Sequence, residues 1–206
     1  MIKEVIFDFD GTIADSFMTI MSIFDEYKKE LGVENFGKKE IEIYRNEGVG
    51  AVLKKTKISL LRFSKVVEEM REKPNHLIAG VKPCKGMSSL LRDLKKKGFV
   101  LGVMSTNGEK TINKFLEKNK IDVFDYVVGK GSLFGKDKVI KLILRKRKLK
   151  IDEVLYIGDE VRDIEACKKL GIKIAAVTWG FSSKKLLAKS KPDFLVDKAE
   201  EILKLV

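Results

Sequence analysis

The sequence predicts an α/β protein with a Rossmann-like parallel sheet in a three-layer α/β/α arrangement and an inserted all-helical cap. From residue 84 onward, short apolar segments alternate with segments of helical periodicity, an order typical of a parallel sheet covered by helices on both faces. Between about residues 15 and 82 the strand-like segments are missing and helical patterns follow one another. We therefore expect a core domain formed by residues 1–14 and 83–206 and a cap domain formed by residues 15–82.

The first strand is expected at Ile2–Phe9, which is rich in β-branched and aromatic residues, as a strand buried on both faces should be. Met1 leads directly into this strand, so we expect no signal peptide. The first helix is expected at Phe17–Leu31, because Asp15 and Ser16 are good N-cap residues. Three further helical stretches complete the inserted segment: Lys39–Glu47, Ala51–Lys55 and Ser59–Lys73.

In the second part of the chain, the element boundaries follow from apolar periodicity, with Gly98 and Gly171 as helix ends. Such sheets bind ligands at the carboxyl ends of their strands, so residues at those ends are the candidates for a site. The expected strands are Phe99–Met104, Asp125–Val128, Val154–Ile157, Lys173–Val177 and Phe194–Val196. The expected helices are Met87–Lys97, Glu109–Asn119, Lys138–Arg147, Asp163–Leu170, Lys184–Ser190 and Ala199–Val206.

The composition describes a soluble, charge-rich globular protein, because 44% of the residues are hydrophobic and 35% are charged. No apolar run approaches the ~20 residues of a membrane span, so we expect no membrane partner. We expect a cytoplasmic protein that is a monomer or a homodimer. Cys84 and Cys167 are expected to be buried or semi-buried thiols rather than a disulfide or metal pair. The single histidine, His76, is expected at the surface, which argues against His-based hydrolysis and His-ligated zinc.

The net charge of +12 is compatible with binding to nucleic acid, to a membrane surface or to small anionic substrates. However, Lys and Arg alternate with Asp and Glu through most of the chain. The densest run, Arg145–Lys148 followed by Lys150, falls at the expected end of a helix, where cations complement the helix dipole. We interpret this run as a solvated helix end and do not expect a nucleic-acid partner.

Asp8 and Asp10 stand at the end of the first expected strand, in the sequence Asp-Phe-Asp-Gly-Thr. Two like charges held close together raise each other's pKa and favour a bound cation or a shared proton. Gly11 permits a sharp turn that leaves both carboxylates in reach of a ligand, and we count Gly11 and Thr12 among the substrate-binding candidates. One Asp could attack while the other moves a proton, with Mg²⁺ bridging to the substrate. The alternative is an ordinary turn after a strand.

Polar residues also follow the next two expected strands. Ser105, Thr106 and Asn107 stand just before a helix, where hydroxyls and backbone N–H groups can seat a phosphate, although they could simply cap the helix. Further on, Lys136 could neutralise a phosphate or a neighbouring carboxylate. Lys138 competes for this role, but we prefer Lys136 because it stands at the junction of loop and helix.

The last candidate pair follows the expected strand Val154–Ile157. Asp159 stands at the strand tip and Asp163 lies one helical turn further on. Paired carboxylates beside a strand tip are costly without a cation, which favours a metal site. The alternative is that both acids cap the helix.

In combination, these residues resemble the motifs of the haloacid dehalogenase superfamily, which consists mostly of phosphatases. The resemblance covers the whole chain, and the inserted helices resemble the family's cap. The layout is similar to that of phosphoglycolate phosphatases and β-phosphoglucomutases. The four motifs follow one another at strand ends in the family's order: Asp8–Thr12, Ser105, Lys136, and Gly158-Asp159 with Asp163.

The resemblance implies that Asp8 is the nucleophile, which forms an aspartyl-phosphate, and that Asp10 protonates the leaving alcohol and then activates water. It also implies a Mg²⁺ ion held by Asp8, Asp159 and the backbone carbonyl of Asp10. Glu160, where relatives often have a small residue, is a candidate for contact with the outer shell of this metal. Asp163 would orient either the motif lysine or a metal-bound water.

The phosphate would be held by Ser105 together with the N–H of Thr106, although Thr106 could supply the hydroxyl itself. Lys136 would offset the charge of nucleophile and phosphate. In the cap, the loop Tyr44–Gly50 is our candidate for substrate contact, with Arg45 binding an anionic group, and the alternative is a plain helix connection. The substrate implied is a small phosphorylated metabolite.

The sequence also has to be compared with three alternatives to a phosphatase. A phosphomutase on the same scaffold would use the same residues and stays open. A dehalogenase is disfavoured by Asp10, because that reaction has no leaving alcohol to protonate. A basic nucleic-acid-binding protein would explain the charge of +12 but leaves the carboxylates at the strand ends unexplained.

Overall fold

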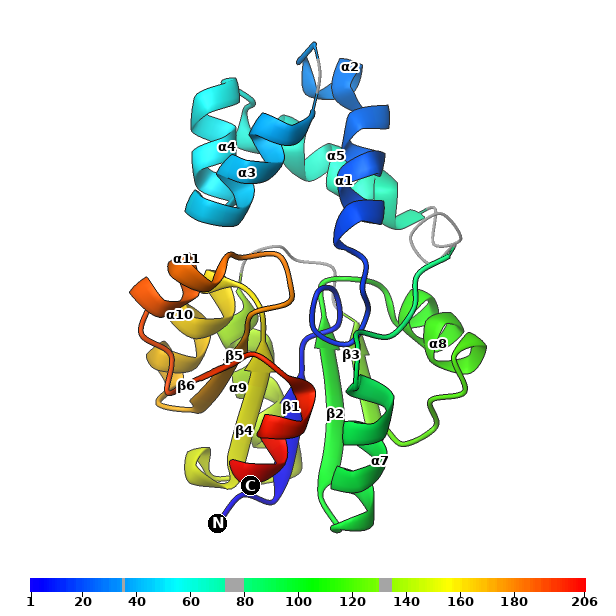
Figure 1. The fold of residues 1–206 in the computed structure, drawn as a ribbon, viewed down its shortest axis with the longest axis vertical. Coiled ribbons are helices and arrows are strands. Elements are labelled where there is room, and N and C mark those ends of the chain that lie inside the picture. Colours follow the sequence, from blue (N-terminus) through cyan, green and yellow to red (C-terminus); the bar gives the residue numbers. More distant parts are fainter. Residues whose placement is uncertain (35, 73–79, 130–134) are drawn as a thin grey trace.

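The computed structural model describes residues 1–34, 36–72, 80–129 and 135–206. Its centre is a six-stranded parallel sheet with the strand order β3-β2-β1-β4-β5-β6, so the predicted α/β class is confirmed (Figure 1). The strands are β1 (Glu4–Phe7), β2 (Val100–Ser105), β3 (Tyr126–Gly129), β4 (Val154–Gly158), β5 (Lys173–Val177) and β6 (Phe194–Val196).

The first strand of the chain lies in the middle of the sheet. In the register of β1, Phe7 stands beside Val103 of β2 on one side and beside Ile157 of β4 on the other. The ladder continues one residue further, where the Asp8 N–H donates to the Ile157 carbonyl at 2.8 Å. Because all the strands are parallel, the carboxyl ends of β1, β2 and β4 meet at one edge of the sheet.

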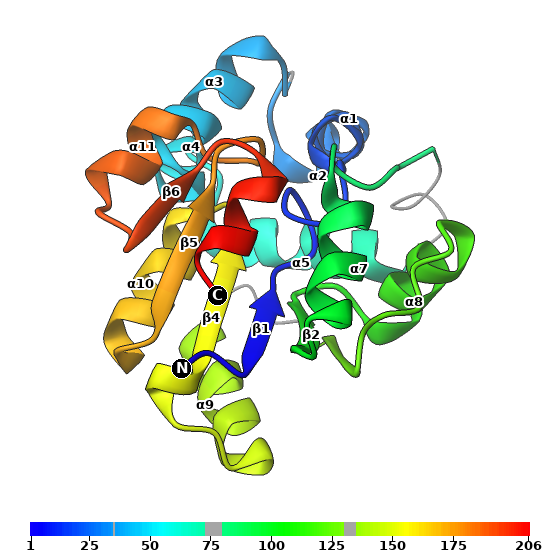
Figure 2. The same cartoon turned by 60° about the horizontal axis from the view of Figure 1, so that its bottom comes forward.

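Helices cover both faces of the sheet (Figure 2). Val5 and Phe7 of β1 face one hydrophobic cluster and Ile6 faces the other, as the alternation of side chains along a strand requires. The first cluster is closed by α7 (Met87–Lys96), α8 (Glu109–Lys118) and the 3₁₀-helix η2 (Ala199–Lys204). The second is closed by α9 (Lys136–Arg147), α10 (Val161–Leu170) and α11 (Lys184–Lys189). A short 3₁₀ turn, η1 (Ile151–Glu153), precedes β4.

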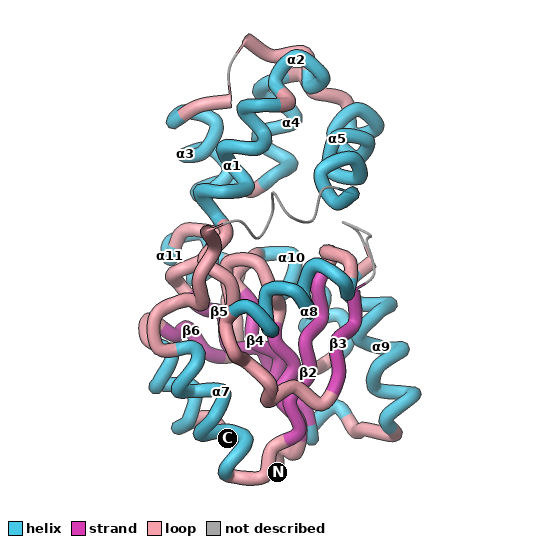
Figure 3. Tube along the Cα trace, turned by 90° about the vertical axis from the view of Figure 1, so that its right-hand side faces the viewer, coloured by secondary structure: helices cyan, strands magenta, loops and turns pink. Residues whose placement is uncertain are grey.

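The inserted helices lie together beyond the carboxyl ends of the strands, and we call them the helical layer (Figures 1 and 3). They have a hydrophobic cluster of their own, in which the Phe24 and Phe63 rings stack at 5.4 Å. The edge of the Phe17 ring meets Phe181 of the core at 5.0 Å, which ties the two parts together. The layer consists of α1 (Phe17–Glu26), α2 (Lys28–Leu31), α3 (Lys38–Glu47), α4 (Val49–Thr56) and α5 (Leu60–Glu72).

The prediction of one continuous helix over Phe17–Leu31 is wrong, because the segment forms two helices, α1 and α2. Its backbone leaves the helical conformation at Tyr27, with φ −89° and ψ 15°, and α2 is a separate single turn. No Pro or Gly forces this break. The Tyr27 side chain packs against the cluster of the helical layer, so tertiary packing sets the change of direction.

Two other expectations need correction. The closing segment Ala199–Val206 is not an α-helix but the 3₁₀-helix η2, in which buried Ala199 and Ile202 share a face because this helix has three residues per turn. The expected contact loop Tyr44–Gly50 is mostly helical, because α3 runs to Glu47 and α4 begins at Val49. Gly48 alone separates them, with φ 84°.

The remaining sequence expectations have mixed outcomes. Cys84 and Cys167 are buried free thiols, as predicted. His76 and the expected helix end at Lys73 lie outside the described residues. Among the described helices, none is long and apolar enough to cross a membrane.

Candidate active site

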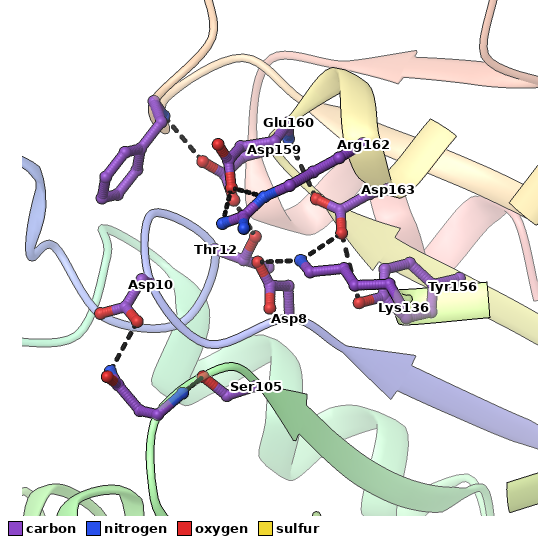
Figure 4. Close-up of polar contacts among 12 residues, drawn as sticks. Asp8, Asp10, Thr12, Ser105, Lys136, Tyr156, Asp159, Glu160, Arg162 and Asp163 are labelled. Atoms are coloured by element: carbon purple, nitrogen blue, oxygen red, sulfur yellow. Dashed lines mark hydrogen bonds and ion pairs between the residues drawn. The ribbon is translucent and has the colours of Figure 1, made fainter. Parts of the chain in front are cut away.

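The turn after β1 carries two carboxylates, Asp8 and Asp10, at the carboxyl ends of the strands (Figure 4). The backbone turns back on itself through Gly11, whose N–H donates to the Ala14 carbonyl at 2.9 Å. Gly11 has a φ of 72°, and a Cβ on it would lie 2.2 Å from Asp159 Oδ2 and 2.4 Å from the Phe181 ring. Only glycine fits this turn, so Gly11 shapes the site through its backbone.

Asp8 is buried and ion-paired with Lys136, the first residue of α9. Lys136 Nζ lies 2.9 Å from Asp8 Oδ2 and also contacts Asp163, so one buried ammonium joins a carboxylate at the end of β1 to one in the first turn of α10. Burial opposes the charged form of Lys136, but Asp163 and Asp8 raise its pKa overall. Burial also raises the pKa of Asp8 to about 7, an effect that Lys136 reduces. Lys138, the competing lysine, is exposed.

Asp10 is half-buried, and hydrogen bonds fix both of its carboxylate oxygens. Ser16 Oγ donates to Oδ1 at 2.7 Å and Asn107 Nδ2 donates to Oδ2 at 2.6 Å. Burial raises the pKa of Asp10 to about 6, although the Ser16 hydroxyl opposes the shift. The Ser16 hydroxyl was expected to cap α1, but it bonds to Asp10 instead. A held carboxyl group with this pKa suits proton transfer near neutral pH.

Asp159 follows β4 and is completely buried. Its oxygens accept hydrogen bonds from the Thr12 hydroxyl at 2.8 Å and from the Phe181 N–H at 2.7 Å. Burial, followed by the charges of Glu160 and Asp8, raises the pKa of Asp159 well above its usual range. Thr12 therefore holds Asp159, and its hydroxyl is directed at that carboxylate.

Glu160 connects the core with the helical layer. Tyr44 of α3 donates its hydroxyl to Glu160 Oε1 at 2.8 Å, and Arg162 at the start of α10 forms an ion pair with the same carboxylate. Burial works against ionisation of Glu160, but Arg162 and then Lys136 lower its pKa overall. Arg162 is not among the candidates from the sequence, although it stands between Glu160 and Asp163.

The donor set fits a hard divalent cation. Oxygens of Asp8, Glu160 and Asp163 all lie within 4.8 Å of one another, and oxygen atoms are the ligands that Mg²⁺ prefers. Asp159 and Asp10 add two further carboxylates, whereas Lys136 and Arg162 are the basic side chains described in this cluster. Buried like charges without full compensation favour a bound cation.

A cavity of about 80 Å³ lies between the core and the helical layer. Glu160 and Arg162 also line a second cavity, of about 570 Å³, which reaches Lys136, Gly48 and the start of α4. From the core, the lining of the smaller cavity comprises Asp10, Thr106, Asn107, Glu160, Arg162 and Phe181. From the helical layer it comprises Ile20, Phe24, Tyr44, Phe63, Val67 and Met70.

Two sequence candidates take up other positions. Ser105 is buried and its hydroxyl accepts a hydrogen bond from the Asn107 N–H at 3.0 Å, whereas Thr106 lines the smaller cavity. The Arg45 guanidinium lies over the Phe17 ring at 5.0 Å, and Arg45 is absent from the described lining of both cavities. Tyr44, its neighbour on α3, reaches the site instead.

The basic run at the end of α9 lies away from this site. Lys136 begins the helix at the site, and Arg147 ends it eleven residues later, or about 17 Å along the helix axis. Arg147 forms an ion pair with buried Glu4, and its guanidinium lies 4.7 Å from the centre of the Tyr126 ring. This part of the run therefore serves the core.

Comparison with known proteins identifies the class to which this fold and site belong. Residues 5–177 match the family model described as haloacid dehalogenase-like hydrolase. The chain therefore belongs to the haloacid dehalogenase-like hydrolases, as the motifs indicated, and it is a hydrolase of the phosphatase type.

Individual relatives match over nearly their whole length. The chain is 31% identical to a phosphoglycolate phosphatase of Aquifex aeolicus, covering 99% of this chain and 96% of the relative. It is 27% identical to a phosphoserine phosphatase of Methanocaldococcus jannaschii, covering 99% and 97%. A solved haloacid dehalogenase-like hydrolase of Streptococcus pneumoniae has a TM-score of 0.82 and 27% identity, covering 99% and 98%.

Proposed function

We propose that the chain is a Mg²⁺-dependent phosphatase that hydrolyses a small phosphomonoester through an aspartyl-phosphate on Asp8. The observation that carries the proposal is the arrangement at the tip of β1. There Asp8 is ion-paired with Lys136, and Asp10 lines the cavity with a raised pKa. Membership of the hydrolase family supports the same chemistry.

In the first step, an Asp8 oxygen forms a bond to phosphorus while the ester P–O bond breaks. The protonated Asp10 carboxyl gives its proton to the departing alkoxide, which leaves as an alcohol. In the second step, the Asp10 carboxylate takes a proton from a water molecule as that water attacks phosphorus. The bond to Asp8 breaks, inorganic phosphate forms, and Asp10 is again protonated.

Three groups of this chain prepare these steps. Lys136 holds Asp8 in place and offsets the negative charge that gathers around it. Ser16 and Asn107 hold Asp10 through both of its oxygens, so its orientation does not change between the two proton transfers. Thr106 lines the cavity as a candidate phosphate contact.

We propose that Mg²⁺ would be held by Asp8, Asp159 and the backbone carbonyl of Asp10. Glu160, one oxygen of which lies within 4.8 Å of an Asp8 oxygen, would contact the outer shell of the ion. Asp159 is completely buried, and its oxygens accept hydrogen bonds from Thr12 and Phe181. Burial, and then the charges of Glu160 and Asp8, raise its pKa, so a bound cation would compensate its ionised form. The bound cation supplies a positive charge against which the phosphoryl oxygens and the carboxylates can approach one another.

Residues 15–82 are proposed to act as a cap that closes the site against water. The described helices of this segment supply half of the lining of the smaller cavity and contact the core through Tyr44 and Phe17. The substrate is proposed to be a small phosphorylated metabolite, because the cavity that Asp10 lines is small and the helical layer supplies half of its lining.

The decisive experiment measures phosphate release from a generic aryl phosphate by the wild type, Asp8→Asn and Asp93→Asn, each with Mg²⁺ and with excess chelator. Asp93 is the control because it lies on α7 with its side chain 47% exposed. We expect Mg²⁺-dependent release that Asp8→Asn abolishes and Asp93→Asn retains, with circular dichroism showing intact folds. Wild-type turnover by Asp8→Asn would refute the proposed nucleophile. Transfer of the phosphoryl group to a sugar phosphate instead of water would identify a phosphomutase.

A further inference from the structure

The small cavity has two chemically different walls. The core contributes polar groups, including Asp10, Asn107 and Glu160. The helical layer contributes mainly apolar side chains: Ile20, Phe24, Phe63, Val67 and Met70. An ester phosphate bound at the strand ends would therefore direct its organic group against the apolar wall.

Positive charge is scarce in this cavity. Among the described residues that line it, Arg162 is the basic one, and it comes from the core and is ion-paired with Glu160. Arg45, the basic residue that the sequence suggested for this purpose, lies over the Phe17 ring. A carboxylate on the organic group would have to give up its water and meet apolar side chains, which is strongly unfavourable.

The size of the cavity restricts the organic group as well. A volume of about 80 Å³ holds about five to eight water-sized groups. That space accommodates a short hydrocarbon group, branched or unbranched, beside the strand ends.

We propose that this enzyme prefers phosphomonoesters with a short, uncharged and apolar organic group over those that carry a carboxylate, such as 2-phosphoglycolate. The inference rests on the proposed phosphatase function and names its substrate class. It differs from what the relatives' names say of those proteins, because the wall of the helical layer in this chain is apolar where a carboxylate would need a cation.

The test uses a matched pair of esters, isobutyl phosphate and 2-phosphoglycolate, which differ by exchange of an isopropyl group for a carboxylate. We expect kcat/KM to be higher for isobutyl phosphate by roughly tenfold or more. Equal values within about threefold, or a preference for 2-phosphoglycolate, would overturn the proposal.

Two variants test the apolar wall directly. Val67→Lys on α5 and Ile20→Lys on α1 place an ammonium in the cavity and should each shift the preference towards 2-phosphoglycolate by about tenfold. Leu61→Lys is the matched control, because Leu61 lies on α5 and is 83% exposed. An equal shift in this control would also count against the proposal.

Binding measured without turnover separates this inference from the proposed function. The thermal shift of the wild type in the presence of Mg²⁺ is measured with each of two non-hydrolysable phosphonates, 3-methylbutylphosphonate and 2-carboxyethylphosphonate, and the two shifts are compared. A larger shift with the alkyl compound supports the apolar site even if no ester is hydrolysed, in which case the proposed function alone fails. A larger shift with the carboxylate overturns the inference.

Discussion

At the scale of single residues, the site is defined by buried carboxylates that are paired with two basic side chains, Lys136 and Arg162. Lys136 contacts both Asp8 and Asp163, and each of these three side chains is at most about a twentieth exposed. Removing Lys136 leaves two buried carboxylates without this cation, which costs far more than loss of a surface ion pair. This dependence separates Lys136 sharply from its exposed neighbour Lys138.

A comparison of the two lysines tests this point. Lys136→Met should lower kcat/KM by roughly 100-fold or more, because the charge beside Asp8, the proposed nucleophile, is lost. Lys138→Met should stay within about twofold of the wild type, as a substitution on the surface away from the site does. Steady-state kinetics of the two variants with one ester provides the measurement, and equal mild effects would contradict the role of Lys136.

The raised pKa values of Asp8 and Asp10 predict how pH and metal act together. In the folded protein these groups keep protons up to about pH 7 and about pH 6, whereas in the unfolded chain they lose them near pH 4. The folded state then binds more protons, so the free energy of unfolding falls as the pH rises from about 4 to about 7. A divalent cation opposes this loss because it favours the ionised carboxylates.

The rise in Tm caused by Mg²⁺ should therefore be larger at about pH 8 than at about pH 5.5. Differential scanning calorimetry with Mg²⁺ and with chelator measures it at both pH values. Asp8→Asn should lose most of this pH dependence. A metal effect that does not vary with pH would argue against these two carboxyl groups as the titrating sites.

At the scale of elements, strand ends and helix starts converge because every strand of the sheet runs in the same direction. The tip of β1 presents Asp8, the tip of β4 leads to Asp159, and α9 begins with Lys136. The opposite ends of the same elements stabilise the core. There Glu4 at the start of β1 is 1% exposed and pairs with Arg147 at the end of α9.

Loss of this pair should destabilise the fold without changing the chemistry. Among the described residues, Arg147→Ala leaves buried Glu4 with the Tyr126 hydroxyl as its side-chain hydrogen-bond partner. Because the Arg147 side chain is itself 35% exposed, we expect a loss of about 1–3 kcal/mol in the free energy of unfolding. Lys146→Ala, at the exposed neighbouring position, should cost less than about 0.5 kcal/mol.

Denaturant unfolding of the two variants measures the difference, and kcat/KM should stay near the wild-type value in both. Similar stability losses for Arg147→Ala and Lys146→Ala would show that the pair with Glu4 contributes little. A selective loss of activity would instead place this end of α9 in the function.

At the scale of the whole molecule, the helical layer meets the core through a few contacts close to the site. Tyr44 bonds to Glu160, and Phe17 packs edge-on against Phe181. The Ser183 N–H also donates to the Arg45 carbonyl at 2.7 Å, which joins the start of α11 to α3. Because Glu160 is also one of the clustered carboxylates, the position of the layer and the state of the site are physically linked.

A double-mutant cycle measures this link. Tyr44→Phe removes a hydrogen bond to a charged group and should lower kcat/KM by about 5- to 30-fold, with the fold retained. Glu160→Gln should also lower it, and the double variant should lose less than the product of the two single effects. Fully multiplicative effects would show that the contact does not couple the layer to the site.

Much of this architecture could be predicted because it depends on local sequence patterns. The alternation of apolar strands and amphipathic helices determined the α/β class, and spacing placed Asp8, Lys136 and Asp159 at strand or helix ends. The break at Tyr27 and the 3₁₀ form of Ala199–Lys204 escaped prediction, because packing against distant residues decided them.

The sequence by itself determined which side chains stand at the ends of the strands and therefore the kind of chemistry that this protein can perform. Only the tertiary structure decided how those side chains pair. Thr12 bonds to Asp159 across 147 residues, and Tyr44 bonds to Glu160 across 116 residues. No local period or spacing reports such contacts, because they exist only after the sheet has brought its strand ends together and the helical layer has packed over them.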